Sequence, residues 1–69
     1  MDEALRDSLM EWYLRFGGRV IDVQKMMKTQ EWVNIRPAWR SSYIQGSGLP
    51  SYSYKITPAG IEALKDEST

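Results

Sequence analysis

The sequence predicts a small α+β domain that is mainly helical and carries one β-hairpin. Apolar residues recur at helical spacing through residues 3–16, and residues 51–56 alternate between apolar and polar side chains. A segment dense in turn formers, residues 46–50, precedes that alternation. The chain has 69 residues, of which 42% are hydrophobic, so we assign residues 1–69 to one domain with a frayed tail at about 66–69.

Residues 3–16 form the first expected helix. Its apolar residues share one face at spacings of four, three and four: Leu5, Leu9, Trp12 and Phe16. Glu11 and Arg15 are four residues apart and form a favourable ion pair on the solvated side. Gly17 and Gly18 then end the helix, because glycine accepts the left-handed conformation of a C-terminal cap.

A second, shorter helix is expected to follow. Residues 19–21 are either a brief strand or the lead-in to this helix. Asp22 is its N-cap, because a carboxylate there accepts from free backbone N–H groups. Val23, Met26 and Met27 then fall on one face, and at this spacing methionines more often fill a core than form a binding surface.

The third helix is expected at Gln30–Arg36, with Thr29 as its cap. Trp32, Ile35 and Trp39 have the spacing of one helical face, but Pro37 would interrupt a helix that includes all three. Pro37 leaves two solutions, because proline disrupts a helix interior but suits a first helical position. Either the helix ends near Ile35 or Arg36, or a new helix begins at Pro37. We expect the first, since turn and strand residues follow.

The hairpin and a last helix complete the chain. Residues 40–45 and 51–56 are its two strands, joined by a loop at residues 46–50. Thr57 and Pro58 then open a short helix, with threonine as the cap and proline in the first turn. Ile61 and Leu64 face inward from it.

The net charge is zero, but the charges are unevenly distributed. Residues 1–14 carry four acidic side chains and one basic side chain, residues 15–55 two acidic and seven basic, and residues 56–69 three acidic and one basic. The middle segment therefore has a net charge of +5. It either attracts an anionic partner or is neutralised by the acidic segments within the fold.

The composition argues against several classes of function. The chain has no cysteine and no histidine, which removes disulfides, thiolate zinc sites and the usual general base. No carboxylate pair or activated serine is apparent, so we expect no enzyme, metal or cofactor. Apolar runs reach only two or three residues and no signal peptide opens the chain, so we expect a cytoplasmic protein that spans no membrane.

One run of residues resembles a known family. Tyr54-Lys55-Ile56-Thr57-Pro58-Ala59-Gly60-Ile61-Glu62-Ala63-Leu64 is similar to the "Y-x-[LI]-T-x-x-G-x-x-x-L" ending of the wing in MarR-type and PadR-type transcriptional regulators. The order helix, short strand or turn, helix, helix, hairpin, short helix extends this likeness over about residues 3–65. The resemblance implies a winged helix-turn-helix, with a three-helix core, a wing and a short C-terminal helix. It also implies that Gly60 lets the last helix lie close to the domain.

The resemblance further implies binding to double-stranded DNA, with the third helix in the major groove and the hairpin against the backbone or the minor groove. Three side chains of the third-helix region would read base edges: Gln30, Asn34 and Arg36. Four cations would contact phosphates: Lys25, Lys28, Arg40 and Lys55. The protein would be a transcription regulator, and a homodimer is compatible with its small core.

The alternative is a protein-interaction module or adaptor on the same scaffold, of the kind found among phage or mobile-element accessory proteins. In this hypothesis Trp32, Trp39 and Tyr43 form an exposed patch, because Trp and Tyr are favoured anchors at protein interfaces. The competing interpretation is that these three aromatic residues are buried in the core.

Overall fold

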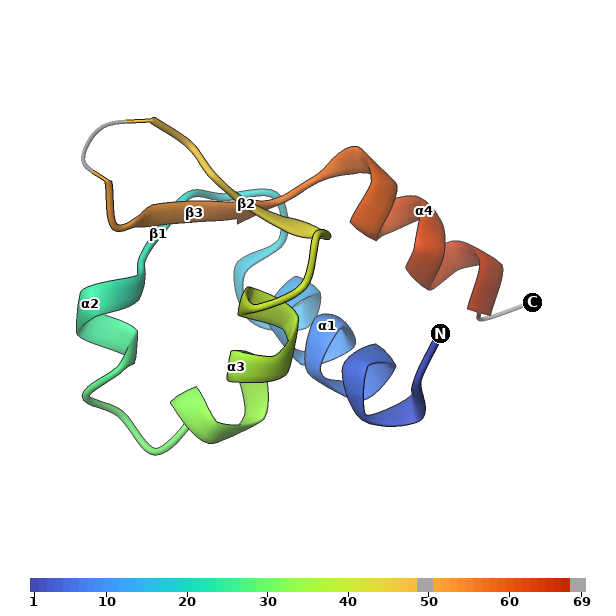
Figure 1. The fold of residues 1–69 in the computed structure, drawn as a ribbon, viewed down its shortest axis with the longest axis horizontal. Helices are drawn as coiled ribbons and strands as arrows, with labels where there is room; N and C mark the ends of the chain where they lie inside the picture. The colour runs from blue at the N-terminus through green and yellow to red at the C-terminus, as the bar shows by residue number, and fades with distance from the viewer. Residues whose placement is uncertain (49–50, 68–69) are drawn as a thin grey trace.

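The computed structural model describes residues 1–48 and 51–67 and contains four helices and three strands within them (Figure 1). In chain order they are α1 (Glu3–Phe16), β1 (Ile21–Asp22), α2 (Val23–Met26), α3 (Trp32–Trp39), β2 (Ile44–Gly46), β3 (Ser53–Ile56) and α4 (Pro58–Glu67). This composition confirms the predicted α+β class. The expected tip of the hairpin includes Leu49 and Pro50, which lie outside the described residues.

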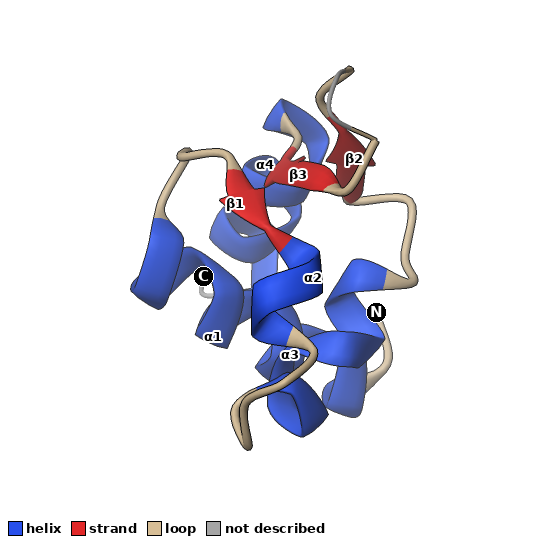
Figure 2. Cartoon of the chain, turned by 90° about the vertical axis from the view of Figure 1, so that its left-hand side faces the viewer, coloured by secondary structure: helices blue, strands red, loops and turns tan. Residues whose placement is uncertain are grey.

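The strands form one antiparallel sheet in the order β1-β3-β2 (Figure 2). Ile44 pairs with Ile56 across the hairpin, and Ile21 pairs with Tyr54 on the other side of β3. The predicted hairpin is therefore confirmed, and of the two alternatives for residues 19–21 the structure contains the short strand. The first hairpin strand begins only at Ile44, because residues 40–43 form turns rather than the expected extended segment.

α1 has the predicted boundaries. Gly17 ends it with a φ of 57°, and its N–H donates to the carbonyl oxygen of Tyr13 at 2.8 Å. This positive φ is the conformation that glycine adopts without the steric penalty of a Cβ atom. The predicted ion pair is also present, with Arg15 Nε 2.7 Å from Glu11 Oε1. Local sequence signals therefore determine both the extent of α1 and its solvated side.

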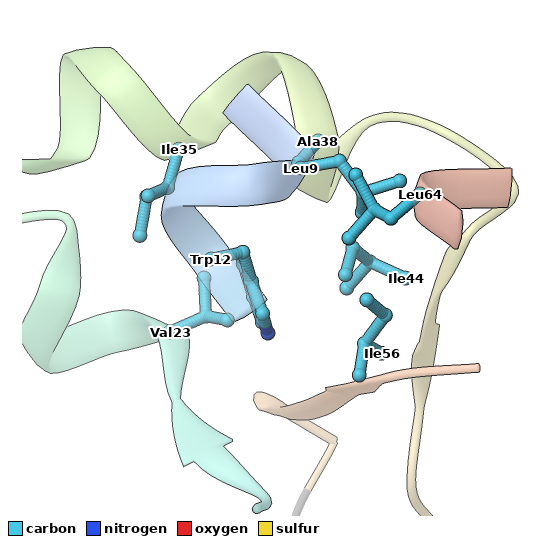
Figure 3. Close-up of a cluster of buried hydrophobic side chains, with 8 residues drawn as sticks. All are labelled: Leu9, Trp12, Val23, Ile35, Ala38, Ile44, Ile56 and Leu64. Atoms are coloured by element: carbon cyan, nitrogen blue, oxygen red, sulfur yellow. The ribbon is translucent and has the colours of Figure 1, made fainter. Parts of the chain in front are cut away.

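The core lies between α1, the sheet and α3 (Figure 3). Its buried side chains come from six of the seven elements: Leu9, Trp12, Val23, Ile35, Ala38, Ile44, Ile56 and Leu64. Trp12 is completely buried, and its indole N–H has no hydrogen-bond partner among the described residues. Because an aromatic ring of this size buries on the order of 150–250 Å², Trp12 is the largest single contribution to this small core.

Asp22 caps α2 as predicted, with its Oδ1 accepting from the Lys25 N–H at 3.2 Å. Val23 is buried and Met26 packs against the core, but Met27 is 45% exposed. The expectation that Met27 fills the core is therefore wrong. α2 ends at Met26, so Met27 belongs to the following turn and does not continue the helical face.

α3 corrects three predictions. It runs from Trp32 to Trp39, so it neither ends near Ile35 or Arg36 nor begins at Gln30. Pro37 lies within the helix on its exposed side. Thr29 does not cap α3 either: its hydroxyl donates to the Met26 carbonyl oxygen at 2.7 Å and so closes the preceding turn.

α4 begins at the predicted cap and packs closely on the domain. Thr57 Oγ1 accepts from the Gly60 N–H at 3.1 Å and donates to the Tyr43 carbonyl oxygen at 2.9 Å. A Cβ atom on Gly60 would lie 2.8 Å from Ile56 Cγ1, which confirms that glycine permits the close approach. The helix extends to Glu67, so the expected frayed tail begins too early; residues 68–69 lie outside the described part of the chain.

Candidate nucleic-acid interface

The outward face of α3 is the part of this helix that is free to contact a partner. The inward face contains Ile35 and Ala38, which are completely buried. At 3.6 residues per turn, Val33 and Pro37 lie on the opposite side of the helix, one turn apart. Val33 is 74% exposed, and Pro37 is exposed as well. The helix therefore presents an apolar strip at the centre of its solvent face.

Two tryptophans hold α3 in place. The rings of Trp32 and Trp39 lie with their centroids 5.1 Å apart, and Trp39 meets the ring of Tyr54 edge-on at 5.8 Å. Trp32, Trp39 and Tyr43 are all half-buried and pack against the core. The hypothesis that they form an exposed patch is therefore wrong, because all three side chains are partly buried against the core.

The predicted base-reading side chains all reach solvent around the apolar strip. Asn34 and Arg36 are exposed on the two flanks of Val33 and Pro37. Gln30 is also exposed but lies in the turn before α3, where its carbonyl oxygen accepts from the Val33 N–H at 3.4 Å. These amide and guanidinium groups offer donors and acceptors in the patterns that match adenine and guanine edges.

Three of the four predicted phosphate contacts lie on α2 or directly after α2 and α3. Lys25 is on α2, Lys28 is in the turn after it, and Arg40 follows the last residue of α3; all three are exposed. Lys55 is different. It is exposed and pairs with Gln45 in the sheet. Its side chain lies on the face of the sheet opposite that of Tyr54, and the Tyr54 ring contacts Trp39 of α3. The structure therefore separates Lys55 from the surface of α3.

Glu31 places a negative charge at the start of α3. A hydrogen bond from its own backbone N–H, together with the Thr29 side chain and the positive charge of Arg15, holds the pKa of Glu31 below its usual value. The carboxylate is therefore ionised at neutral pH. It opposes the approach of a phosphate to this end of the helix.

Other classes of site find no support in the described part of the chain. Across residues 1–48 and 51–67, no three acidic side chains gather where they would hold a metal ion. Among the helices of the same residues, none is both long enough and apolar enough to cross a bilayer.

The chain matches no family model, no curated protein and no solved structure.

Val33 and Pro37 are the exposed residues of α3 that the sequence analysis did not single out. The signal is present in the sequence, because the same periodicity that directs Trp32, Ile35 and Trp39 inward directs positions 33 and 37 outward. A helix that ends before Pro37, as expected from the sequence, does not bring the two positions together. Once α3 continues to Trp39, they become neighbours on one face.

Proposed function

We propose that this chain is a winged helix-turn-helix protein of the cytoplasm that binds duplex DNA through α3 and regulates transcription, with no catalytic activity of its own. The observation that carries the proposal is the solvent face of α3. Exposed side chains that can pair with base edges, together with cations, surround it, and a fully apolar inner face holds the helix in place. A helix presented in this way fits the major groove, which is wide enough to admit it.

The order of the elements supports the same proposal. α2 and α3 are joined by five residues, 27–31, and a hairpin and a further helix follow them, as in the family that the sequence resembles. Figure 3 shows Val23 of α2 and Ile35 of α3 both directed into the core, so the two helices pack into the same hydrophobic cluster. Their outer surfaces then carry Lys25, Lys28 and Arg40 toward solvent.

The decisive experiment is fluorescence anisotropy of a labelled mixed-sequence duplex at low and physiological salt. We expect affinity to fall steeply with salt, because cations that contact phosphates release counterions. The double variant Arg36→Ala with Arg40→Ala should weaken binding and flatten the log–log salt slope by about one unit, because Arg40 no longer meets a phosphate while Arg36 loses a base contact. Wild-type salt dependence in that variant would contradict the proposal.

A matched pair of single variants tests which face binds. Arg40→Ala removes a cation at the end of α3, whereas Lys55→Ala removes one from the far face of the sheet. We expect Arg40→Ala to weaken binding and Lys55→Ala to leave it near the wild-type value. Equal losses in the two variants would indicate that the sheet face, and not α3, meets the DNA.

A protein-interaction module is the second candidate, and one observation favours it. α1 and α4 enclose a shallow apolar pocket of about 150 Å³. Its lining residues are Met10, Tyr13, Ile61, Leu64 and Lys65. Sedimentation over a range of concentrations tests whether a second copy of this chain covers it. If a second copy covers the pocket, an Ile61→Lys variant should be monomeric. A wild-type protein that stays monomeric at all concentrations would show that no second copy covers it.

A further inference from the structure

Val33 is the most exposed large hydrophobic side chain in the described residues, at 74%. It lies at the centre of the solvent face of α3, with the exposed ring of Pro37 one turn further on. Both residues are unusual choices for this position. A β-branched residue and a proline each disfavour a helix, and neither side chain is buried here. Helix stability and core packing therefore do not explain the apolar strip.

The surroundings of the strip indicate an anionic partner with apolar groups. Arg36 and Arg40 lie beside it, and Asn34 borders its other side. Major-groove DNA combines these properties, since phosphates line the groove and thymine alone among the four bases carries a methyl group there. A valine side chain makes only apolar contacts. Pro37 likewise adds apolar surface and no N–H donor.

We propose that Val33 is a specificity-determining residue that contacts the C5-methyl group of thymine, an inference that rests on the DNA binding proposed above. The adjacent Asn34 is then placed to pair with adenine through its amide, because asparagine matches the N6 and N7 edge of that base. Together the two residues make the protein prefer A·T pairs at the centre of its site. The cations bind any sequence and set the overall affinity.

The test compares three labelled duplexes of equal length: alternating A and T, alternating A and deoxyuridine, and alternating G and C. Deoxyuridine differs from thymidine in base only by the absent methyl group, so the first two duplexes isolate the contact. Wild-type protein should bind the thymine duplex about fourfold more tightly than the deoxyuridine duplex for each methyl group that leaves water. The G and C duplex should be bound more weakly still.

Two variants complete the experiment. Val33→Ala should remove the discrimination between thymine and deoxyuridine and retain the salt slope. Leu14→Ala is the matched control, because Leu14 is 72% exposed on the side of α1 opposite Trp12 and should discriminate like wild type. Both side chains lie in solvent, so neither change should alter the circular dichroism spectrum.

The outcomes separate the two proposals. Equal wild-type binding of the thymine and deoxyuridine duplexes would overturn the role of Val33 and leave DNA binding intact. Discrimination that persists in Val33→Ala would overturn it too, by assigning the methyl contact to another residue. Failure to bind any of the three duplexes even at low salt would refute DNA binding itself, and the role of Val33 with it.

Discussion

The hydroxyl of Ser8 on α1 accepts a hydrogen bond from the backbone N–H of Ala38 on α3, with Ser8 Oγ 2.9 Å from Ala38 N. Both residues are buried, and the donor directly follows Pro37. Proline disturbs the regular bonding of a helix at its own position, so a polar partner in the neighbouring helix stabilises the turn that contains it. This bond links α1 to the helix that carries the proposed interface.

Replacing Ser8 with alanine should destabilise the fold. The variant leaves a buried N–H without this acceptor, which costs about 1–3 kcal/mol. Urea unfolding followed by circular dichroism measures the change as a lower midpoint with an unaltered slope. Ser42→Ala is the control, because Ser42 is exposed and should shift the free energy of unfolding by less than about 0.5 kcal/mol. Equal midpoints for the two variants would show that the Ser8 hydroxyl adds nothing.

Replacing Gly60 with alanine should also destabilise the protein, although alanine is the better helix former. The new Cβ atom would lie 2.8 Å from Ile56 Cγ1 and 3.1 Å from both Cβ and the carbonyl oxygen of Tyr43. Overpacking of this kind costs about 1–3 kcal/mol. Thermal unfolding measures it, with Gly18→Ala as the control, because a Cβ on Gly18 meets nothing within 4 Å. A Gly60→Ala protein as stable as Gly18→Ala would contradict the close approach of α4.

Replacing Thr57 with alanine should cost about 1 kcal/mol or somewhat more, since it removes the cap of α4. The same hydroxyl also donates to Tyr43, so the loss extends to the start of the hairpin. Urea unfolding of Thr57→Ala and Thr57→Ser makes the comparison. The serine variant retains the hydroxyl and should recover most of the stability; a serine variant as unstable as the alanine variant would exclude a role for the hydroxyl.

Replacing Glu31 with glutamine should strengthen DNA binding about two- to fivefold at neutral pH, the effect of one exposed charge. The variant removes an ionised carboxylate from the start of α3, where it repels phosphates. Anisotropy at low salt measures the gain, and Glu62→Gln on α4 provides a charge-matched control away from α3. An equal gain in both variants would attribute the effect to net charge alone.

The same carboxylate should give a small pH dependence of stability. The pKa of Glu31 is lowered in the folded state, so its contribution is present above the ordinary glutamate pKa and is lost as the pH falls through the folded value. At neutral pH the wild type should therefore be slightly more stable than Glu31→Gln. The two midpoints of urea unfolding should converge in acid. A difference between the midpoints that widens in acid would contradict a lowered pKa of Glu31 in the folded state.

Several features of the fold followed from the sequence because they depend on neighbours in the chain. The spacing of apolar residues determines α1. Gly17 ends the helix because its own backbone adopts a positive φ, which requires no distant contact. Asp22 and Thr57 cap their helices through bonds that reach three residues along the chain. Gln30, Asn34 and Arg36, which the family resemblance singled out for base reading, are all exposed in the structure.

Tertiary structure decided the rest, because the contacts join residues far apart in sequence. The pairing of Ile21 with Tyr54 adds β1 to the hairpin, and no local pattern specifies that partner. Ser8 of α1 accepts a hydrogen bond beside Pro37, and α3 continues to Trp39, so that Val33 and Pro37 share its outward face. The sheet register turns Lys55 away from that face. The sequence by itself thus determined which short elements form, while long-range packing determined which side chains share a surface.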